Sequence, residues 1–166
     1  DIRLPRTVLI ALVGAALAGS GAAYQGLFRN PLADPYLIGV ASGAGLGAVL
    51  AMSVKWPYTT LGLMAVPLAA FLASLLTVYL VYIFANVGGT VPTTSLILAG
   101  VAFSSFATSL TSFLMLKSNS ELRRAIGWLL GGVSLAGWDV ILALIPYLLI
   151  GLTTLILNGY ALNLLQ

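Results

Sequence analysis

Five long apolar runs dominate the sequence and limit what it can fold into. They extend over residues 7–28, 36–54, 58–85, 94–116 and 140–157. A helix that crosses the apolar core of a bilayer needs about 20 mainly apolar residues, whereas a strand of a membrane barrel needs about 10 residues of alternating polarity. The runs have the helical length and do not alternate. The sequence therefore predicts an all-α polytopic membrane protein with about five transmembrane helices and a short interfacial helix at about 120–130.

The composition indicates that lipid is the solvent for these helices. Of the 166 residues, 60% are hydrophobic and 7% are charged, and the mean hydropathy is +1.09. A soluble domain carries about a quarter charged residues. We therefore expect membrane lipid around the chain. The formal charge of +3 comes from seven basic and four acidic residues, which are too few and too scattered to bind nucleic acid.

Residue types that carry chemistry are scarce. The sequence has no cysteine and no histidine, which removes thiol chemistry and the commonest metal ligand. The Gly88-Gly89 pair lacks the lysine of a phosphate-binding loop. We expect no catalytic residue, no metal site and no cofactor. The four acidic residues lie in or beside predicted connections, not in mid-helix where they would indicate a proton relay or an ion site: Asp1, Asp34, Glu121 and Asp139.

Small residues recur every four positions in the first two predicted helices. Gly14 and Ala18 belong to such a row in the first helix, and Gly39, Gly43 and Gly47 form one in the second. Small residues at this spacing let helix backbones approach closely inside a membrane. We expect other helices to surround the first helix. Such rows also occur as generic packing in any polytopic protein, so they bear on architecture and not on function.

Hydroxyl side chains follow one face of the fourth predicted helix. Gly100, Ser104, Thr108 and Ser112 are spaced by four residues. Such a row can line a water-filled path for a polar solute. The hydroxyls can equally bond to carbonyls of their own helix one turn back, which has no functional meaning. The residues alone leave both interpretations open.

Several motifs together resemble the FecCD-type permeases. The resemblance covers essentially the whole chain, in order and with similar spacing, and it implies import of iron-siderophores, haem or cobalamin. The motifs are Arg3-Leu4-Pro5-Arg6, Gly14 to Gly21, Gln25, Arg29-Asn30-Pro31-Leu32-Ala33-Asp34-Pro35, Gly39, Ser42-Gly43-Ala44, Leu98 to Ala102, Trp128 to Gly132, Trp138 and Leu162 to Leu165.

The resemblance implies an assembly larger than this chain. Permeases of the family have ten membrane helices and work as homodimers, with two ATPase subunits and a periplasmic binding protein, in the cytoplasmic (inner) membrane of bacteria or archaea. By motif, residues 1–166 are expected to be one permease domain that begins before the family's second helix and ends near its sixth. This would be about half of a permease, as a fragment, a truncated product or one part of a split gene.

The resemblance also implies roles for the charged start of the chain. Arg3 and Arg6 match family arginines that pair with carboxylates on the binding protein. Such pairs would mainly set orientation and encounter rate, and salt would weaken them. Alternatively, the two arginines only anchor a helix end among lipid headgroups.

Two further elements match the family's cytoplasmic gate. Asn30 and Leu32 match one gate loop, and Thr93 and Thr94 match the other, with helix capping by the threonine hydroxyls as the alternative. The fourth helix corresponds to the family's pathway-lining helix, which favours a pathway role for Ser104, Thr108 and Ser112.

Charge and resemblance disagree about membrane orientation. The family topology makes the more basic side periplasmic, whereas the positive-inside rule would make it cytoplasmic, and we expect the family topology. The more basic side carries Arg3, Arg6, Lys55, Lys117, Arg123 and Arg124, and Arg29 lies on the other side.

Besides an importer subunit, two functions stay open. One is an ion-coupled secondary transporter, which should show an intramembrane carboxylate or helices broken at the midplane. The other is a non-transporting membrane scaffold.

Overall fold

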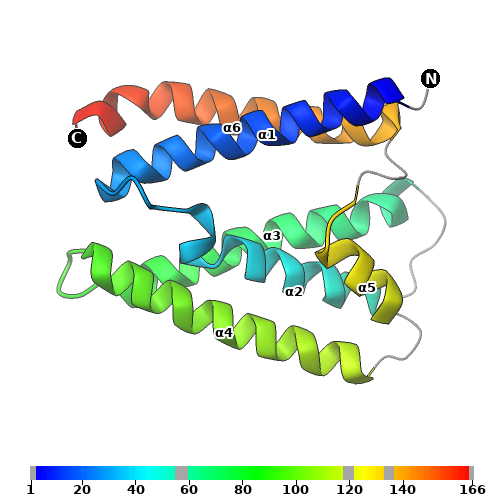
Figure 1. Cartoon of the computed structure of the whole chain (residues 1–166). Coiled ribbons are helices and arrows are strands. Elements are labelled where there is room, and N and C mark those ends of the chain that lie inside the picture. The colour runs from blue at the N-terminus through cyan, green and yellow to red at the C-terminus, as the bar shows by residue number, and fades with distance from the viewer. Residues whose placement is uncertain (1–2, 55–59, 118–121, 133–136, 165–166) are drawn as a thin grey trace. The chain divides into compact units, whose positions relative to one another are not determined.

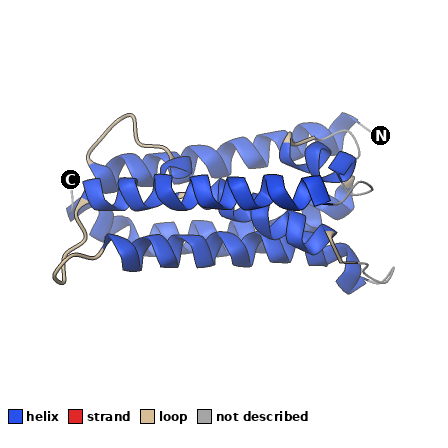
Figure 2. Ribbon diagram, turned by 90° about the horizontal axis from the view of Figure 1, so that it is seen from below, coloured by secondary structure: helices blue, strands red, loops and turns tan. Residues whose placement is uncertain are grey.

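The computed structural model describes residues 3–54, 60–117, 122–132 and 137–164. Within these ranges the chain is helical (Figures 1 and 2), and the only extended pairing is an isolated bridge between Val87 and Thr90. The all-α prediction is confirmed. The elements are α1 (Arg3–Phe28), the 3-10 turn η1 (Pro35–Ile38), α2 (Val40–Met52), α3 (Thr60–Ala85), α4 (Thr93–Lys117), α5 (Leu122–Leu129) and α6 (Trp138–Leu164).

Four of the described helices are long and apolar enough to cross a membrane. They are α1, the Met64–Ala85 part of α3, α4, and the Trp138–Tyr160 part of α6. Each has at least 22 residues, which at about 1.5 Å per residue matches a bilayer core about 30 Å thick. The chain is therefore a multi-pass membrane protein. The short helix expected at about 120–130 corresponds to α5.

The second apolar run differs from the uninterrupted helix predicted over 36–54. It forms η1 and then the 13-residue helix α2, separated by Gly39 at φ +82°. The Gly39 N–H donates to Tyr36 O (3.1 Å) and Gly39 O accepts from the Gly43 N–H (2.9 Å), so one turn closes at Gly39 and a new helix starts there. A left-handed residue interrupts regular helical geometry, and glycine adopts it without steric cost. At about 20 Å, α2 is shorter than a bilayer core.

The chain divides into two compact units. The first comprises Asp1–Asp34 and Gly131–Gln166, and the second comprises Pro35–Leu130. In the first unit α1 lies alongside α6 (Figure 1). A Cβ placed on Gly19 would make ordinary van der Waals contact with Leu155 Cδ1 at 4.0 Å.

The second unit has its core where α2 packs between α3 and α4. η1 also contacts α4, and α5 packs on α2. The cluster of buried side chains joins three elements at the C-terminal end of α2, and α5 closes that end. Its members are Ala48, Val49 and Met52 of α2, Ala70 of α3 and Ala125 of α5.

A tight turn connects α3 to α4 in the second unit. Val87 N–H donates to Thr90 O (2.8 Å) and Thr90 N–H donates to Val87 O (3.2 Å). The two residues between them, Gly88 and Gly89, both have positive φ, at 61° and 84°. This pattern is a two-residue hairpin turn of the kind that requires positive φ at both central positions. The two glycines therefore provide the positive φ angles that this turn requires.

Candidate functional site

The hydroxyl row on α4 turns gradually from the interior of its unit to its surface. Gly100 is buried, Ser104 is half-buried, and Thr108 and Ser112 are exposed. Successive residues of an α-helix are 100° apart, so a row spaced by four drifts about 40° at each step. The four positions therefore do not share one environment. The buried face of the helix continues instead through Ala107 and Thr111.

Four hydroxyls of α4 donate to carbonyls one turn back, and one of them, Ser112, belongs to the predicted row. Ser112 Oγ donates to Thr108 O at 2.9 Å, and Ser105, Ser109 and Thr111 make equivalent bonds at 2.8–2.9 Å. Such bonds satisfy a hydroxyl inside an apolar environment. They also leave the oxygen lone pairs able to accept a hydrogen bond from a passing solute. The observed geometry is compatible with both interpretations of the row.

The two threonines matched to a gate begin α4. Thr93 and Thr94 are exposed and are the first two residues of the helix. Pro92 O accepts from the Leu96 N–H at 3.0 Å, so Pro92 occupies the N-cap position. Hydroxyl capping, which the sequence left open, therefore does not explain why two threonines stand at this position.

The other gate-matched segment begins where α1 ends. Asn30 N–H donates to Gln25 O (3.2 Å) and Arg29 N–H donates to Gly26 O (3.3 Å), the paired bonds of a Schellman motif. Arg29 takes the left-handed position at φ 48°, where glycine is usual. Asn30 Oδ1 then accepts from the Leu32 N–H at 2.9 Å. This turn holds Leu32 with its side chain 85% exposed.

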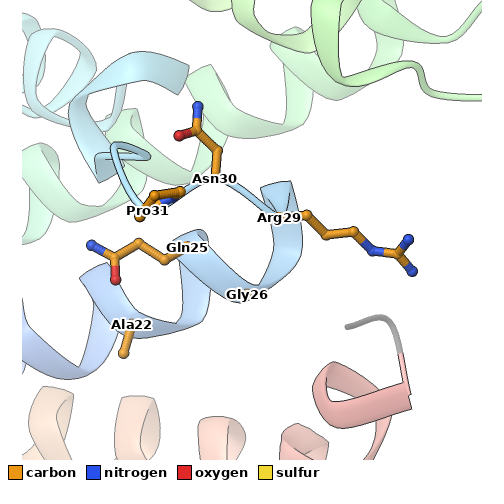
Figure 3. Close-up of a pocket in the computed structure, with 6 residues that line it drawn as sticks. All are labelled: Ala22, Gln25, Gly26, Arg29, Asn30 and Pro31. Atoms are coloured by element: carbon orange, nitrogen blue, oxygen red, sulfur yellow. The ribbon is translucent and has the colours of Figure 1, made fainter.

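A pocket of about 400 Å³ lies at this end of α1 (Figure 3). In the figure the side chains of Gln25, Arg29 and Asn30 point in three different directions. The pocket therefore offers no convergent set of groups for a small ligand. It is lined by Ala22, Gln25, Gly26, Arg29, Asn30 and Pro31.

Two arginines lie in the first turns of α1, where helix electrostatics does not favour them. Arg3 is exposed and Arg6 is half-buried. The N-terminus of a helix carries a partial positive charge, so a cation there is unfavourable by roughly 0.3–1 kcal/mol. Docking and anchoring among headgroups both stay predictions for these two arginines.

The glycine row of α2 lies where this helix meets α3. A Cβ on Gly43 would overlap Thr77 Oγ1 and lie 2.8 Å from Thr77 Cβ, and one on Gly47 would overlap Ala69 O. Gly39 is also buried, at the break before α2. The small residues of α1 are placed differently, because Gly14 has nothing within 4 Å of such a Cβ and Ala18 is exposed.

The site residues expected from the sequence are divided between the two units. Arg3, Arg6, Asn30 and Leu32 belong to the first unit, and the α4 residues and the α2 glycines belong to the second. Among the described residues no group of three or more His, Cys, Asp or Glu could hold a metal ion. Sequence reasoning placed Gly100 in the hydroxyl row. In the structure Gly100 packs against the backbone of η1, a contact that no feature of the sequence indicated.

Comparison with known proteins relates the whole chain to a family of transport proteins. The sequence profile of the FecCD transport family matches residues 1–166. The uncharacterised ABC transporter permease protein YvrB of Bacillus subtilis is 42% identical over 98% of the chain and 46% of its own length. The cobalamin import system permease protein BtuC of Halobacterium salinarum is 42% identical over 99% and 43%.

A third relative and a solved structure agree with these two. The iron-uptake system permease protein FeuC of Bacillus subtilis is 35% identical over 94% of the chain and 48% of its own length. The solved structure, an inward-facing conformation assigned to a metal-chelate type ABC transporter, superposes with a TM-score of 0.85 at 33% identity, over 99% of this chain and 52% of that one. The chain thus spans about half the length of the curated relatives that it matches.

Proposed function

The chain belongs to the FecCD transport family, and we propose on this basis that it forms part of the transmembrane permease of an ATP-driven importer for a metal chelate, haem or cobalamin. The observation that carries the proposal is the match along all 166 residues. It is supported by relatives named for cobalamin import and for iron uptake, each at least 35% identical. ATP would be hydrolysed by separate ATPase subunits, so the chain itself is not an enzyme.

The proposed path follows α4. The hydroxyls of Ser104, Thr108 and Ser112 are neutral, and a neutral hydrogen bond contributes only about 0.5–1.5 kcal/mol. A cargo that must leave the path needs weak contacts of this kind. The cargo is proposed to pass as a preformed chelate that retains its own ligands, and a sequence without histidine or cysteine fits this proposal.

Docking of a periplasmic binding protein is proposed at the start of α1. Arg3 and Arg6 would pair with carboxylates on that protein, which accounts for two cations at a position where the helix dipole disfavours them. The membrane would be the bacterial or archaeal cytoplasmic membrane, with this end of α1 on the periplasmic side. The further partners proposed are a second permease copy and two ATPase subunits.

The gate is proposed at the opposite end of α1 and at the start of α4. Asn30 holds a tight turn that exposes Leu32, and Thr93 and Thr94 are exposed at the first turn of α4. An exposed leucine and exposed small hydroxyl side chains are residue types that suit a constriction, which closes by apolar contact and opens when its parts move apart.

The two alternatives make different demands on the structure. A secondary transporter should have an ionisable group or a broken helix at the membrane midplane. The observed break at Gly39 lies near the start of the second apolar run, and Asp139 lies in the first turn of α6. Neither is at the middle of a run. The scaffold alternative predicts binding to partners without transport, and uptake measurements distinguish it.

The docking proposal is tested by photocrosslinking in the full-length protein. A crosslinking amino acid at position 3 or 6 should capture the loaded binding protein, whereas the same residue at Ile10, exposed further along α1, should not. In a separate binding measurement, Arg3→Glu with Arg6→Glu should abolish binding of the loaded binding protein and leave membrane insertion intact, and added salt should weaken binding to the parent. Unchanged affinity in the double variant would mean that the arginines only anchor the helix among headgroups.

A further inference from the structure

The turn η1 approaches α4 closely with its backbone at Gly100. A Cβ placed on Gly100 would overlap Leu37 O and would lie 2.8 Å from Ile38 Cα and 3.1 Å from Leu37 C. Gly100 is buried in this contact. The Leu37 carbonyl oxygen lies where a side chain of residue 100 would be, which is the arrangement of a Cα–H···O contact between closely packed backbones. Only glycine at position 100 admits it.

A second contact lies one helical turn further along α4. A Cβ on Gly39 would lie 3.1 Å from Ser104 Oγ and 3.2 Å from Thr77 Cγ2. The last residues of η1 and the residue that follows it therefore face two positions of α4 spaced by four, Gly100 and Ser104. Ile38 is the one buried side chain of η1, and its Cα lies beside Gly100 in the same contact.

The break at Gly39 separates η1 from the helix that follows it. The left-handed geometry of Gly39 (φ +82°) interrupts helical hydrogen bonding between η1 and α2. η1 is therefore not a rigid extension of α2. At its other end, Pro35 continues directly into the segment that carries Asn30 and Leu32. The position of η1 thus depends on α4 more than on either of its neighbours in the chain.

We infer that Gly100 is a positioning residue: by admitting the Leu37 carbonyl, it joins η1 to α4 so that the two move as one body. A displacement of α4 then moves the Pro35 end of the segment 29–34 with it. The inference rests on the proposed function for its purpose, because it would link the pathway helix to the proposed gate. The joint itself is a property of the fold and can be measured without transport.

The inference is tested by distances between spin labels in the full-length protein. One label replaces Tyr36 of η1 and the other Leu98 of α4, whose side chains are 64% and 71% exposed. Labels at Leu76 of α3 and Leu98 give a reference pair. In the parent assembled with its ATPase subunits, the 36–98 distribution should be narrow and should stay the same with and without ATP. A 36–98 distance that changes between these states more than the 76–98 distance would overturn the inference.

Gly100→Ala provides the decisive variant. Its methyl group must displace the Leu37 carbonyl by about 1 Å or more to reach ordinary contact distance, so the 36–98 distribution should shift or broaden while the 76–98 distribution is retained. The matched control is Gly151→Ala in α6, where a Cβ meets nothing within 4 Å. Adding Leu37→Ala to Gly100→Ala should not restore the parent distribution, because the obstruction is backbone. Restoration would show a side-chain contact and refute the joint.

The outcomes separate this inference from the proposed function. An unchanged 36–98 distribution in Gly100→Ala refutes the joint even if the protein transports. A shifted distribution supports the joint even if no ATP-dependent uptake is found. If Gly100→Ala does not fold, the comparison of the parent with and without ATP still tests the joint, because it requires only the spin labels and no substitution at Gly100. In a transporting protein, Gly100→Ala should lower uptake per ATP hydrolysed, whereas Gly151→Ala should leave this ratio unchanged.

Discussion

Replacing Gly47 by alanine probes the close approach of α2 and α3 most directly. A Cβ at this position would overlap Ala69 O and lie 2.5 Å from Ala73 Cβ. Two carbon atoms pack favourably at about 3.5–4.0 Å. The two helices would therefore have to separate locally by about 1 Å. A backbone carbonyl cannot rotate away as the end of a flexible side chain can, so the strain must be taken up by the helices themselves.

The expected magnitude follows from two opposing terms. Overpacking a well-packed site costs about 1–3 kcal/mol, and the backbone obstruction places Gly47→Ala in the upper half of this range. Replacing glycine by alanine inside a helix contributes about 1 kcal/mol in the other direction. The net loss in free energy of unfolding is then about 1–2 kcal/mol. At Gly151, where a Cβ meets nothing within 4 Å, only the favourable term acts.

The assay is unfolding of the full-length protein by sodium dodecyl sulfate in mixed micelles, with Gly151→Ala as the matched control. The two variants should differ by about 2–3 kcal/mol, with Gly47→Ala the less stable. Gly43→Ala adds an internal check, because its closest contacts are with the Thr77 side chain. Thr77→Gly should therefore reduce the cost of Gly43→Ala and not that of Gly47→Ala. Equal stability of Gly47→Ala and Gly151→Ala would refute the packing of α2 on α3 described here.

Three further substitutions test separate parts of the structure. Arg29→Gly should be more stable than Arg29→Ala by about 1 kcal/mol in the same unfolding assay, since both remove the guanidinium and only glycine relieves the left-handed backbone; equal stabilities would contradict that geometry. Thr108→Val should lower the uptake rate by up to about tenfold with stability changed by less than about 0.5 kcal/mol, and unchanged uptake would remove Thr108 from the path. Gly14→Leu should disrupt assembly of the full-length protein if other helices cover α1, and a normal yield of assembled protein would show that this face contacts lipid.

The long helices could be predicted from the sequence because hydropathy and length determine them. α3 and α4 begin and end within two residues of the predicted runs, whereas α1 begins four residues before its run 7–28 and α6 ends seven residues after its run 140–157. The second run could not be predicted in the same way. Gly39 has the same spacing as Gly43 and Gly47, and all three suit close helix packing, so nothing local distinguishes the one that adopts a left-handed conformation. That conformation depends on contacts with α3 and α4, which are distant in sequence.

The candidate site was predictable in residue type and not in placement. The spacing of Ser104, Thr108 and Ser112 indicated a common face of α4, and the 40° drift per step moves the row from the interior to the surface. Gly100 could be read as one more small residue in that row. Its contact with the Leu37 carbonyl requires the turn η1, which hydropathy does not encode. Composition and spacing alone indicated a polytopic membrane protein; the resemblance to a family supplied the proposed roles.

Uptake by the full-length protein in liposomes tests the proposed function most directly. The protein would be reconstituted with its ATPase subunits and loaded binding protein, and labelled cobalamin, haem and a ferric siderophore would be offered in parallel. An importer permease should accumulate one of these cargoes only when ATP is hydrolysed, and ionophores that collapse ion gradients should have no effect. Accumulation that follows an ion gradient in the absence of ATP hydrolysis would contradict the proposal and favour a secondary transporter. Binding of the partners without accumulation of any of the three cargoes would contradict it as well and favour a scaffold.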